Sequence, residues 1–365
     1  MIIAMLAFAA LFLAFSNGAN DNFKGFATVW GSATLSYRRA LIFATIATVL
    51  GGIASVVIAD ALVAQFSGKG LVGDELANAP EFALSVATGA AATVILATRL
   101  GFPISTTHSL VGGLVGAGLA LSDQAINLGN LGSKFVLPLL TSPFLAAALA
   151  FGAYLVIRLM PKKPEEDCIC IIEQREAAIA SDSGAVMART PSHPAIRIAH
   201  RADCDAGPKP LLRGSIARLL DKLHIFSAAS ICFARGVNDT PKLAALLIGT
   251  QIASAQGSAI AVAAAMAIGG WLLSRRVAET MSMKINQLDS TQGVSANLIT
   301  AGLVLMASRF GLPVSTTHVS VGSIIGTGAA AGTLDLTMVR NVILSWVATL
   351  PIAAGIAFGV GMVVG

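Results

Sequence analysis

Long apolar segments, separated by short polar ones, follow one another along this chain. They cover residues 1–19, 40–64, 82–99, 104–121, 133–158, 224–250, 254–274, 294–309, 314–332 and 340–365. Several approach the ~20 residues that an α-helix needs to cross a bilayer. The segments 104–121 and 314–332 are shorter and interrupted by glycines, which is typical of re-entrant hairpins or broken helices. The pattern predicts an all-α polytopic membrane protein with about 10–12 membrane segments.

Polar residues gather in a single stretch between residues 159 and 222. From Arg158 to Lys222 lie 11 of the 24 Lys and Arg residues and 9 of the 19 Asp and Glu residues. The whole chain is 55% hydrophobic and 12% charged, about half the charged fraction of a soluble domain. The stretch is rich in proline and has no apolar periodicity. We therefore expect a first transmembrane repeat at 1–158, a cytoplasmic, partly disordered polar linker at 159–222, and a second repeat at 223–365.

The basic residues predict how the chain is oriented in a cell (plasma or inner) membrane. Arg38 and Arg39 follow the first apolar unit, whereas loop 65–81 is mainly acidic. Because cytoplasmic loops carry the excess of Lys and Arg, the linker 159–222 is expected inside and both termini outside. The first repeat then starts outside and the second inside, as in an inverted repeat. The net charge of +5 follows from this bias and gives no reason to expect nucleic-acid binding.

Two polar motifs recur in both halves of the chain. Gly-Phe-Pro-Ile-Ser-Thr-Thr-His at 101–108 returns as Gly-Leu-Pro-Val-Ser-Thr-Thr-His at 311–318. The segment Ser-Asn-Gly-Ala-Asn-Asp at 16–21 corresponds to Ala-Arg-Gly-Val-Asn-Asp at 234–239. Repetition within a membrane protein predicts a binding site where the two repeats meet, near the middle of the bilayer.

The Ser-Thr-Thr triplets offer donors to an anion. A proline ends one helix, and the triplet opens the next with hydroxyls and free backbone N–H groups. Such a helix start suits a tetrahedral oxyanion, because it donates hydrogen bonds and carries a partial positive charge. The alternative is that the hydroxyls only cap a helix. The candidate substrate residues are Ser105, Thr106, Thr107, Ser315, Thr316 and Thr317.

The Asn-Asp pairs offer oxygen ligands to a cation. Asp21 and Asp239 lie in apolar sequence, where a lone carboxylate is unfavourable and normally has a cation or proton as partner. A helix break at the preceding glycine would free carbonyls, so that Asn20, Asp21, Asn238 and Asp239 could hold Na⁺. The alternative is that each Asp caps a half-helix.

Three further polar residues accompany these motifs. His108 and His318 lie one turn into the helices that follow the triplets, where they could fix geometry or move a proton. Gln292 precedes the last apolar region and could reach the anion or start a helix.

With these motifs the chain resembles the inorganic phosphate transporter (PiT) family of cation-coupled phosphate permeases. The resemblance covers both halves but not the linker. It implies two inverted repeats with broken helices and re-entrant helical hairpins, a homodimer, and import of inorganic phosphate with Na⁺ or H⁺ and no other cofactor. By that resemblance the Ser-Thr-Thr residues line the anion site, and Asn20, Asp21, Asn238 and Asp239 serve the coupling cations.

The chain departs from the family signature at matched positions. Lys24 and Lys242 stand where the family has Asn in Gly-Ala-Asn-Asp-Val-Ala-Asn, and Asn297 stands where it has Glu. We expect the two ammonium groups to lie beside Asp21 and Asp239, where they could take over the electrostatic role of Na⁺, or to face the anion. The alternative is that both lysines extend to a membrane interface.

Other functions remain as alternatives. A sulfate permease would use the same donors, although a carboxylate acceptor in the site would favour the protonated phosphate. A membrane enzyme is less favoured, since no Gly-x-Ser-x-Gly elbow accompanies Ser105, His108 or Cys232. A channel is also less favoured, because intramembrane carboxylates paired with broken helices fit a coupled carrier better. In the linker a loose metal set of Cys168, Cys170, His193, His200 and Cys204 matches no standard zinc spacing.

Overall fold

The computed structural model describes residues 1–59, 61–122, 125–159, 168–174, 193–199, 212–249, 253–285 and 288–365. They form two compact units. The first contains Met1–Ile157 and His224–Gly365, and the second contains Arg158–Leu223. Both halves of the membrane sequence therefore belong to one unit, which we call the membrane unit.

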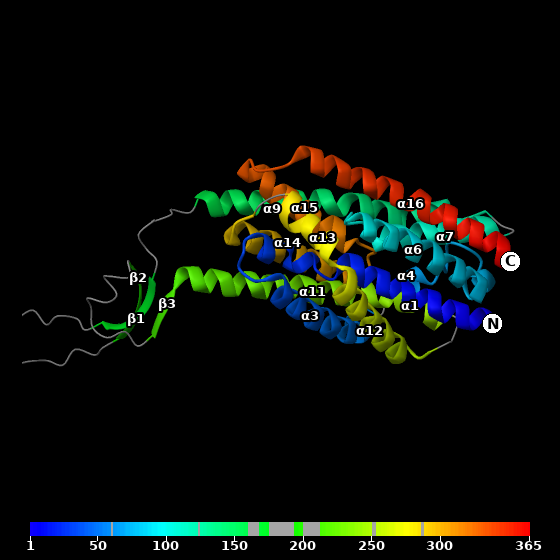
Figure 1. Ribbon diagram of the computed structural model, residues 1–365, viewed down its shortest axis with the longest axis horizontal. Helices are drawn as coiled ribbons and strands as arrows, with labels where there is room; N and C mark the ends of the chain where they lie inside the picture. The colour runs from blue at the N-terminus through cyan, green and yellow to red at the C-terminus, as the bar shows by residue number, and fades with distance from the viewer. Residues whose placement is uncertain are drawn as a thin grey trace, which may run out of the picture. The chain divides into compact units, whose positions relative to one another are not determined.

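The membrane unit is a bundle of helices (Figure 1). In its first half the helical elements are α1 (Ile2–Asp21), η1 (Lys24–Phe26), α2 (Ala27–Gly31), α3 (Tyr37–Ile58), α4 (Ala61–Phe66), α5 (Asp74–Ala77), α6 (Pro80–Leu100), α7 (Thr106–Leu121), α8 (Leu128–Asn130), η2 (Leu131–Val136) and α9 (Leu137–Leu159). In its second half they are α11 (Ile216–Gly249), α12 (Ala255–Leu273), α13 (Arg275–Glu279), η3 (Thr280–Lys284), α14 (Ser290–Arg309), α15 (Thr316–Ala331) and α16 (Leu336–Val364). The elements η2 and η3 are single π-helical stretches.

The helices confirm the expected all-α polytopic membrane protein. Among the described residues, six helical stretches are long and apolar enough to cross a bilayer: Ile2–Gly31, Tyr37–Ile58, Pro80–Leu100, Leu128–Leu159, Ala255–Leu273 and Leu336–Val364. That is fewer than the 10–12 segments expected. The difference arises because α7 and α15 have only 16 residues each, while α11 and α14 contain several polar residues, so length and composition alone do not mark them as spans.

A helix ends at only one of the two Asn-Asp motifs. In the first half α1 ends at Asp21, and the 3₁₀ turn η1 follows. In the second half α11 runs without interruption past Asp239 and through Pro241. The helix break that we expected at the glycine of each motif is present in neither half, because α1 continues through Gly18 to Asp21 and α11 continues through Gly236.

Helices of one half pack on helices of the other through glycines. A Cβ added to Gly18 of α1 would lie 1.9 Å from the carbonyl oxygen of Met266 in α12, and one on Gly116 of α7 would lie 2.0 Å from that of Ala354 in α16. The corresponding glycines of the second half, Gly236 and Gly326, approach Thr48 of α3 and Ala147 of α9 equally closely. Such backbone contact requires a residue without a side chain. These exchanged contacts join the two halves into one unit.

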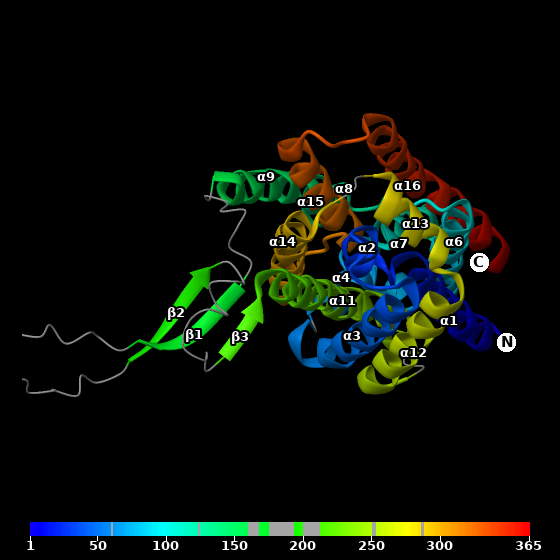
Figure 2. The same cartoon turned by 60° about the vertical axis from the view of Figure 1, so that its left-hand side comes forward.

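The two chain ends lie at the same end of the membrane unit in both views (Figures 1 and 2). The last turns of α9 lie at the opposite end (Figure 1). The placement of both termini on one side of the membrane stays a prediction. Which side that is, and whether the halves are inverted, remain predictions.

The second unit contains a three-stranded antiparallel sheet in the order β2-β1-β3 (Figure 2). Its strands are β1 (Cys168–Gln174), β2 (His193–Ala199) and β3 (Leu212–Ser215). Cys168 pairs with Ala199 on one side and with Ser215 on the other. The sequence pattern did not predict these strands, because they are short and separated by long polar stretches.

Candidate anion-binding site

Each Pro-x-Ser-Thr-Thr-His motif forms a turn between two helices. Helix α6 ends at Leu100 and is capped by Gly101, whose φ of 78° lies in the left-handed region, and Phe102 N–H donates to the Ala97 carbonyl at 2.9 Å. The second copy repeats this geometry after α14, where Gly311 has a φ of 66° and Leu312 N–H donates to the Ala307 carbonyl at 2.9 Å. Glycine adopts this conformation without a steric penalty. The chain then crosses the proline and starts α7 or α15.

The two serines act as helix caps. The hydroxyl oxygen of Ser105 accepts from the backbone N–H of His108 at 3.1 Å, and that of Ser315 accepts from His318 at 3.2 Å. This is the capping role that we weighed against anion binding. Each cap orients the next two threonines toward the centre of the molecule, where Thr107 and Thr317 are buried.

The two asparagines hold the turns in place. The Asn20 side-chain amide donates to Thr98 Oγ1 and to the Phe102 carbonyl, both at 3.0 Å, and its oxygen accepts from Ile104 N–H at 3.2 Å. The Asn238 oxygen likewise accepts from Ser308 Oγ at 3.1 Å. The amide oxygens that we considered as Na⁺ ligands are therefore engaged by protein donors.

The two lysines are buried, and they contact oxygens from both halves. Lys24 is 2% exposed, and its Nζ contacts Asp21 Oδ1, Thr317 Oγ1 and, at 3.1 Å, the Ile104 carbonyl oxygen. Lys242 is 1% exposed, and its Nζ lies 3.0 Å from Thr107 Oγ1, 2.7 Å from the Val314 carbonyl oxygen and 3.7 Å from Asp239 Oδ1. Neither ammonium extends to an interface, so that alternative is wrong.

Arg235 is a further buried cation in this cluster, which the sequence reasoning missed. Its Nη2 donates to Asn17 Oδ1 at 2.6 Å, and its Nε lies 3.5 Å from Asp239 Oδ2. The Asn17 amide in turn lies 3.4 Å from Asp21 Oδ2 and 3.3 Å from Asp239 Oδ2, so it links the two carboxylates. The sequence does mark Arg235, because it replaces Asn17 in the aligned repeats and is a charged residue within apolar sequence.

With all five of its ionisable groups charged, the cluster has one surplus positive charge. Asp21 and Asp239 supply two negative charges, and Lys24, Arg235 and Lys242 supply three positive ones. None of the five side chains is more than 5% exposed. A buried cluster of this composition is unfavourable without a counter-ion, and it attracts an anion.

The unused donors around the cluster come from the threonines and the helix starts. Thr107 and Thr317 already donate to the Val314 and Ile104 carbonyls, at 3.3 and 2.8 Å. Thr106 Oγ1 accepts from the Asn17 amide at 3.0 Å, which leaves its own O–H available. Among the described residues Thr316 has no side-chain hydrogen bond, and the first N–H groups of α7 and α15 lack partners within their helices. The arrangement can bind an anion through neutral donors and release it again.

The histidines lie beside the cluster, at a largely apolar cavity. The His108 and His318 rings are 4.4 Å apart and perpendicular, and His318 lies against Trp346 with ring centroids 3.9 Å apart. Trp346 donates to the Pro103 carbonyl at 3.1 Å. Both histidines line a cavity of about 370 Å³ between α7, α9, α15 and α16. These contacts are typical of residues that fix the position of the hairpins.

Gln292 does not belong to the site in this structure. It forms a capping box with Asp289, with hydrogen bonds of 2.8 and 3.0 Å, and its amide donates to Tyr154 OH at 3.2 Å. In the described part of the chain none of its hydrogen bonds reaches a Ser-Thr-Thr triplet. This is the helix-starting role that we considered as the alternative to anion binding.

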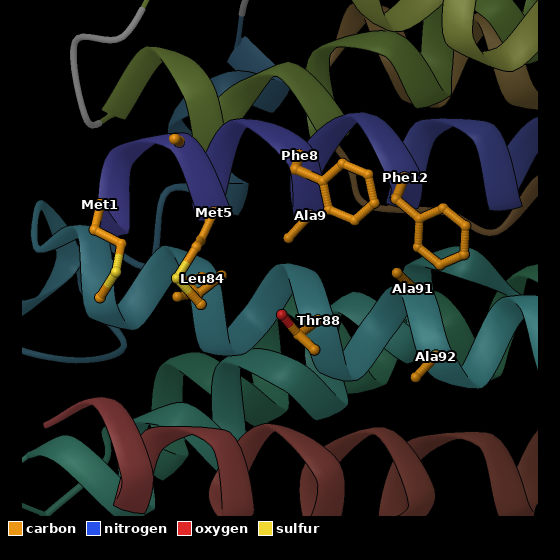
Figure 3. Close-up of a pocket in the computed structure, with 10 residues that line it drawn as sticks. Met1, Met5, Phe8, Ala9, Phe12, Leu84, Thr88, Ala91 and Ala92 are labelled. Carbon is orange, nitrogen blue, oxygen red and sulfur yellow. The ribbon is translucent and has the colours of Figure 1, made fainter.

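A second hollow lies between α1 and α6 and is apolar (Figure 3). It is lined by Met1, Ala4, Met5, Phe8, Ala9, Phe12, Leu84, Thr88, Ala91 and Ala92. Phe8 is 72% exposed, so this face is suited to contact with lipid. Thr88 offers the one side-chain hydroxyl of the lining, which makes the hollow a poor site for an anion.

The loose Cys and His set of the linker receives no support as a metal site. Among the described residues, no group of three or more His, Cys, Asp or Glu side chains could hold a metal ion. Cys168 and Cys170 are buried in the sheet with Sγ atoms 3.6 Å apart. His200 and Cys204 lie outside the described residues.

The fold and the site define a class: multi-pass α-helical membrane proteins with two helix starts directed at a buried, positively charged cluster. Comparison with known proteins agrees with this class. The profile of the phosphate transporter family matches residues 17–357, and the chain belongs to this family. The expected resemblance to phosphate permeases is confirmed.

Known relatives cover almost the whole chain. The chain is 28% identical to a provisionally named phosphate permease of Thermococcus kodakarensis, over 97% of this chain and 96% of that one. It is 26% identical to one of Mycobacterium tuberculosis, over 100% and 87%. A solved structure titled the sodium-dependent phosphate transporter has a TM-score of 0.77 at 22% identity, covering 99% of this chain and 98% of that one. That structural match establishes the fold.

Proposed function

We propose that this chain imports inorganic phosphate by secondary active transport with alternating access, coupled to Na⁺ or H⁺. A single observation carries the proposal. The starts of α7 and α15, each preceded by a capping serine, meet at a buried cluster with one surplus positive charge. A tetrahedral oxyanion fits between such helix starts. Membership of the phosphate transporter family supports phosphate as the anion.

The threonine hydroxyls and backbone N–H groups would hold the anion. In this scheme Thr106 and Thr316 donate through their O–H groups, while the helix starts donate through backbone N–H. The lysines compensate charge without binding phosphate so strongly that it could not leave. Ser105 and Ser315 contribute by capping the helices that present these donors.

The closed cluster supports transport by alternating access. Threonines and lysines of opposite halves contact each other across the centre, as in the Lys24–Thr317 and Lys242–Thr107 pairs. Movement of one half against the other would separate these contacts on one side at a time and expose the anion site. A carrier needs such an occluded state, whereas an open channel does not.

The test is uptake of radiolabelled phosphate into liposomes that contain the purified protein. Phosphate and arsenate should compete with the label, and sulfate should compete weakly. Unlabelled phosphate inside the liposomes should accelerate uptake, as expected of a carrier. Failure of internal phosphate to accelerate uptake would contradict the carrier mechanism, and stronger competition by sulfate would contradict the substrate.

Two variants test the site. Thr106→Val with Thr316→Val removes two donors and should reduce uptake at least ten-fold, since a lost hydrogen bond to a charged group is worth about 1.5–3 kcal/mol. Thr88→Val in the apolar hollow is the matched control and should leave uptake unchanged.

We further infer that the protein resides in the cell membrane, with the linker 159–222 in the cytoplasm and both termini outside, and that it forms a homodimer. The shared end of the two termini and the basic residues of the linker support this orientation. Protease digestion of intact cells should remove a tag from either terminus and spare one inserted in the linker.

A further inference from the structure

The ammonium groups of Lys24 and Lys242 lie where a transported cation would bind. We propose that these two groups act as built-in cations in place of coupling Na⁺ ions, so that the protein transports its anion without Na⁺. The inference rests on the proposed function of phosphate transport. It concerns which cation drives transport through that same site, and it differs from the Na⁺ binding that the Asn-Asp motifs suggest.

Each ammonium is surrounded by three oxygens of different kinds. Lys24 Nζ meets a carboxylate of Asp21, a carbonyl of Ile104 and a hydroxyl of Thr317. Lys242 Nζ meets the same three kinds of oxygen from Asp239, Val314 and Thr107. Carboxylate, carbonyl and hydroxyl oxygens are the ligands that hard cations take in proteins. The cages are therefore cation sites in their chemistry, and a side chain fills each.

At Lys24 the number of donors matches the number of oxygens. An ammonium group has three N–H bonds and no acceptor. Lys24 has three hydrogen-bonding oxygens, so none of its N–H bonds remains to face the anion. Lys242 has two hydrogen-bonding oxygens, of Thr107 and Val314, and an ion-pair contact with Asp239 Oδ1 at 3.7 Å. At Lys24 this argues against the alternative in which the ammonium binds phosphate directly. Both lysines act on the anion through their charge.

The remaining residues do not fit Na⁺. The amide oxygens of Asn20 and Asn238, which could have been ligands, accept from Ile104 N–H and Ser308 Oγ. The cluster already has a surplus positive charge before any ion binds. Two further cations would raise it to three and would repel one another in a buried site.

Each lysine also joins the two halves, as a coupling ion would. Lys24 connects Asp21 of the first half to Thr317 of the second, and Lys242 connects Asp239 of the second half to Thr107 of the first. A bound Na⁺ stabilises the closed site only while it is present. A tethered ammonium provides the same link permanently, so closure no longer depends on external Na⁺.

The first measurement is the initial rate of phosphate uptake in external NaCl and in external choline chloride of equal ionic strength. The external pH and the imposed pH gradient are the same in both salts. The wild-type rates should agree within about two-fold. Lys24→Asn with Lys242→Asn removes both charges and supplies amide oxygens. Uptake by this variant should fall at least ten-fold in choline and recover in part with Na⁺. Lys134→Asn, an exposed lysine, is the control and should behave as wild type.

The second measurement does not depend on transport. Thermal unfolding in detergent should give the same Tm in NaCl and choline chloride for wild type and Lys134→Asn, whereas Na⁺ should raise the Tm of the double variant. A rise in the wild-type Tm with Na⁺, or strictly Na⁺-dependent wild-type uptake, would overturn the inference. Absence of phosphate uptake in every salt, with no effect of Na⁺ on the wild-type Tm, would count against the proposed phosphate transport and leave the built-in cations supported.

Discussion

Removing one member of the Asp21–Lys24 pair should destabilise the protein far more than removing both. Lys24→Met leaves the Asp21 carboxylate, 1% exposed, beside Asn17 and without its closest cation. Asp21→Asn leaves a buried ammonium whose oxygen partners are all uncharged. A buried charge that has lost its partner costs about 3–5 kcal/mol, whereas replacing both charges by neutral groups is often nearly neutral.

A double-mutant cycle gives the coupling energy between Asp21 and Lys24. If each single variant loses about 3–5 kcal/mol and the double variant about 0–2, the coupling energy is at least about 4 kcal/mol. At 1.4 kcal/mol per factor of ten, each single variant would lower the folding equilibrium constant by roughly two to three and a half orders of magnitude. The measurement is denaturant or thermal unfolding in detergent, followed by tryptophan fluorescence.

An exposed pair of similar geometry is the control. Arg275 Nε lies 3.1 Å from Glu279 Oε1, and the two side chains are 72% and 41% exposed. Arg275→Met should change stability by less than about 1 kcal/mol, because water screens the exposed pair. The reasoning is refuted if Lys24→Met is as mild as Arg275→Met, or if the Asp21→Asn, Lys24→Met double variant loses the sum of the two single losses.

Three further predictions follow from packing and hydrogen bonding. Gly116→Ala should lower Tm, since the new Cβ would lie 2.0 Å from the Ala354 carbonyl oxygen and overpacking costs about 1–3 kcal/mol. The control Gly355→Ala, whose new Cβ would have nothing within 4 Å, should leave Tm equal or higher. Equal losses of Tm in the two variants would contradict the close packing at Gly116. Arg235→Leu should abolish phosphate uptake and lower Tm, because it removes the surplus positive charge and a cationic partner of Asp239. If the variant took up phosphate with the kinetics of the wild type, the surplus charge would not be needed. Gln292→Ala should lower stability by about 1 kcal/mol through loss of the capping box while KM for phosphate stays constant, and a raised KM would return Gln292 to the anion site.

The fold class and the candidate residues could be predicted from the sequence because they depend on local chemistry. Apolar length identifies membrane helices wherever they lie in the chain. The duplicated Pro-x-Ser-Thr-Thr-His motif identifies helix starts, and both copies form capped starts with the same left-handed glycine. The placement of Lys24 and Lys242 after the Asn-Asp motifs marked them as charges in need of a partner.

What those residues do was decided by contacts between distant segments. The sequence could not distinguish an anion donor from a helix cap at Ser105, or a cation ligand from a structural link at Asn20, since both roles use the same atoms. It also gave no reason to join Lys24 with Thr317, 293 residues away. That contact exists because helices of one half pack on helices of the other, and it determines that Lys24 and Thr317 complete one site. The amino-acid sequence is enough to identify a membrane protein with two matched polar motifs. The oxygens that surround each ammonium depend on the tertiary fold, because burial leaves a charge no partner except the groups that folding brings to it.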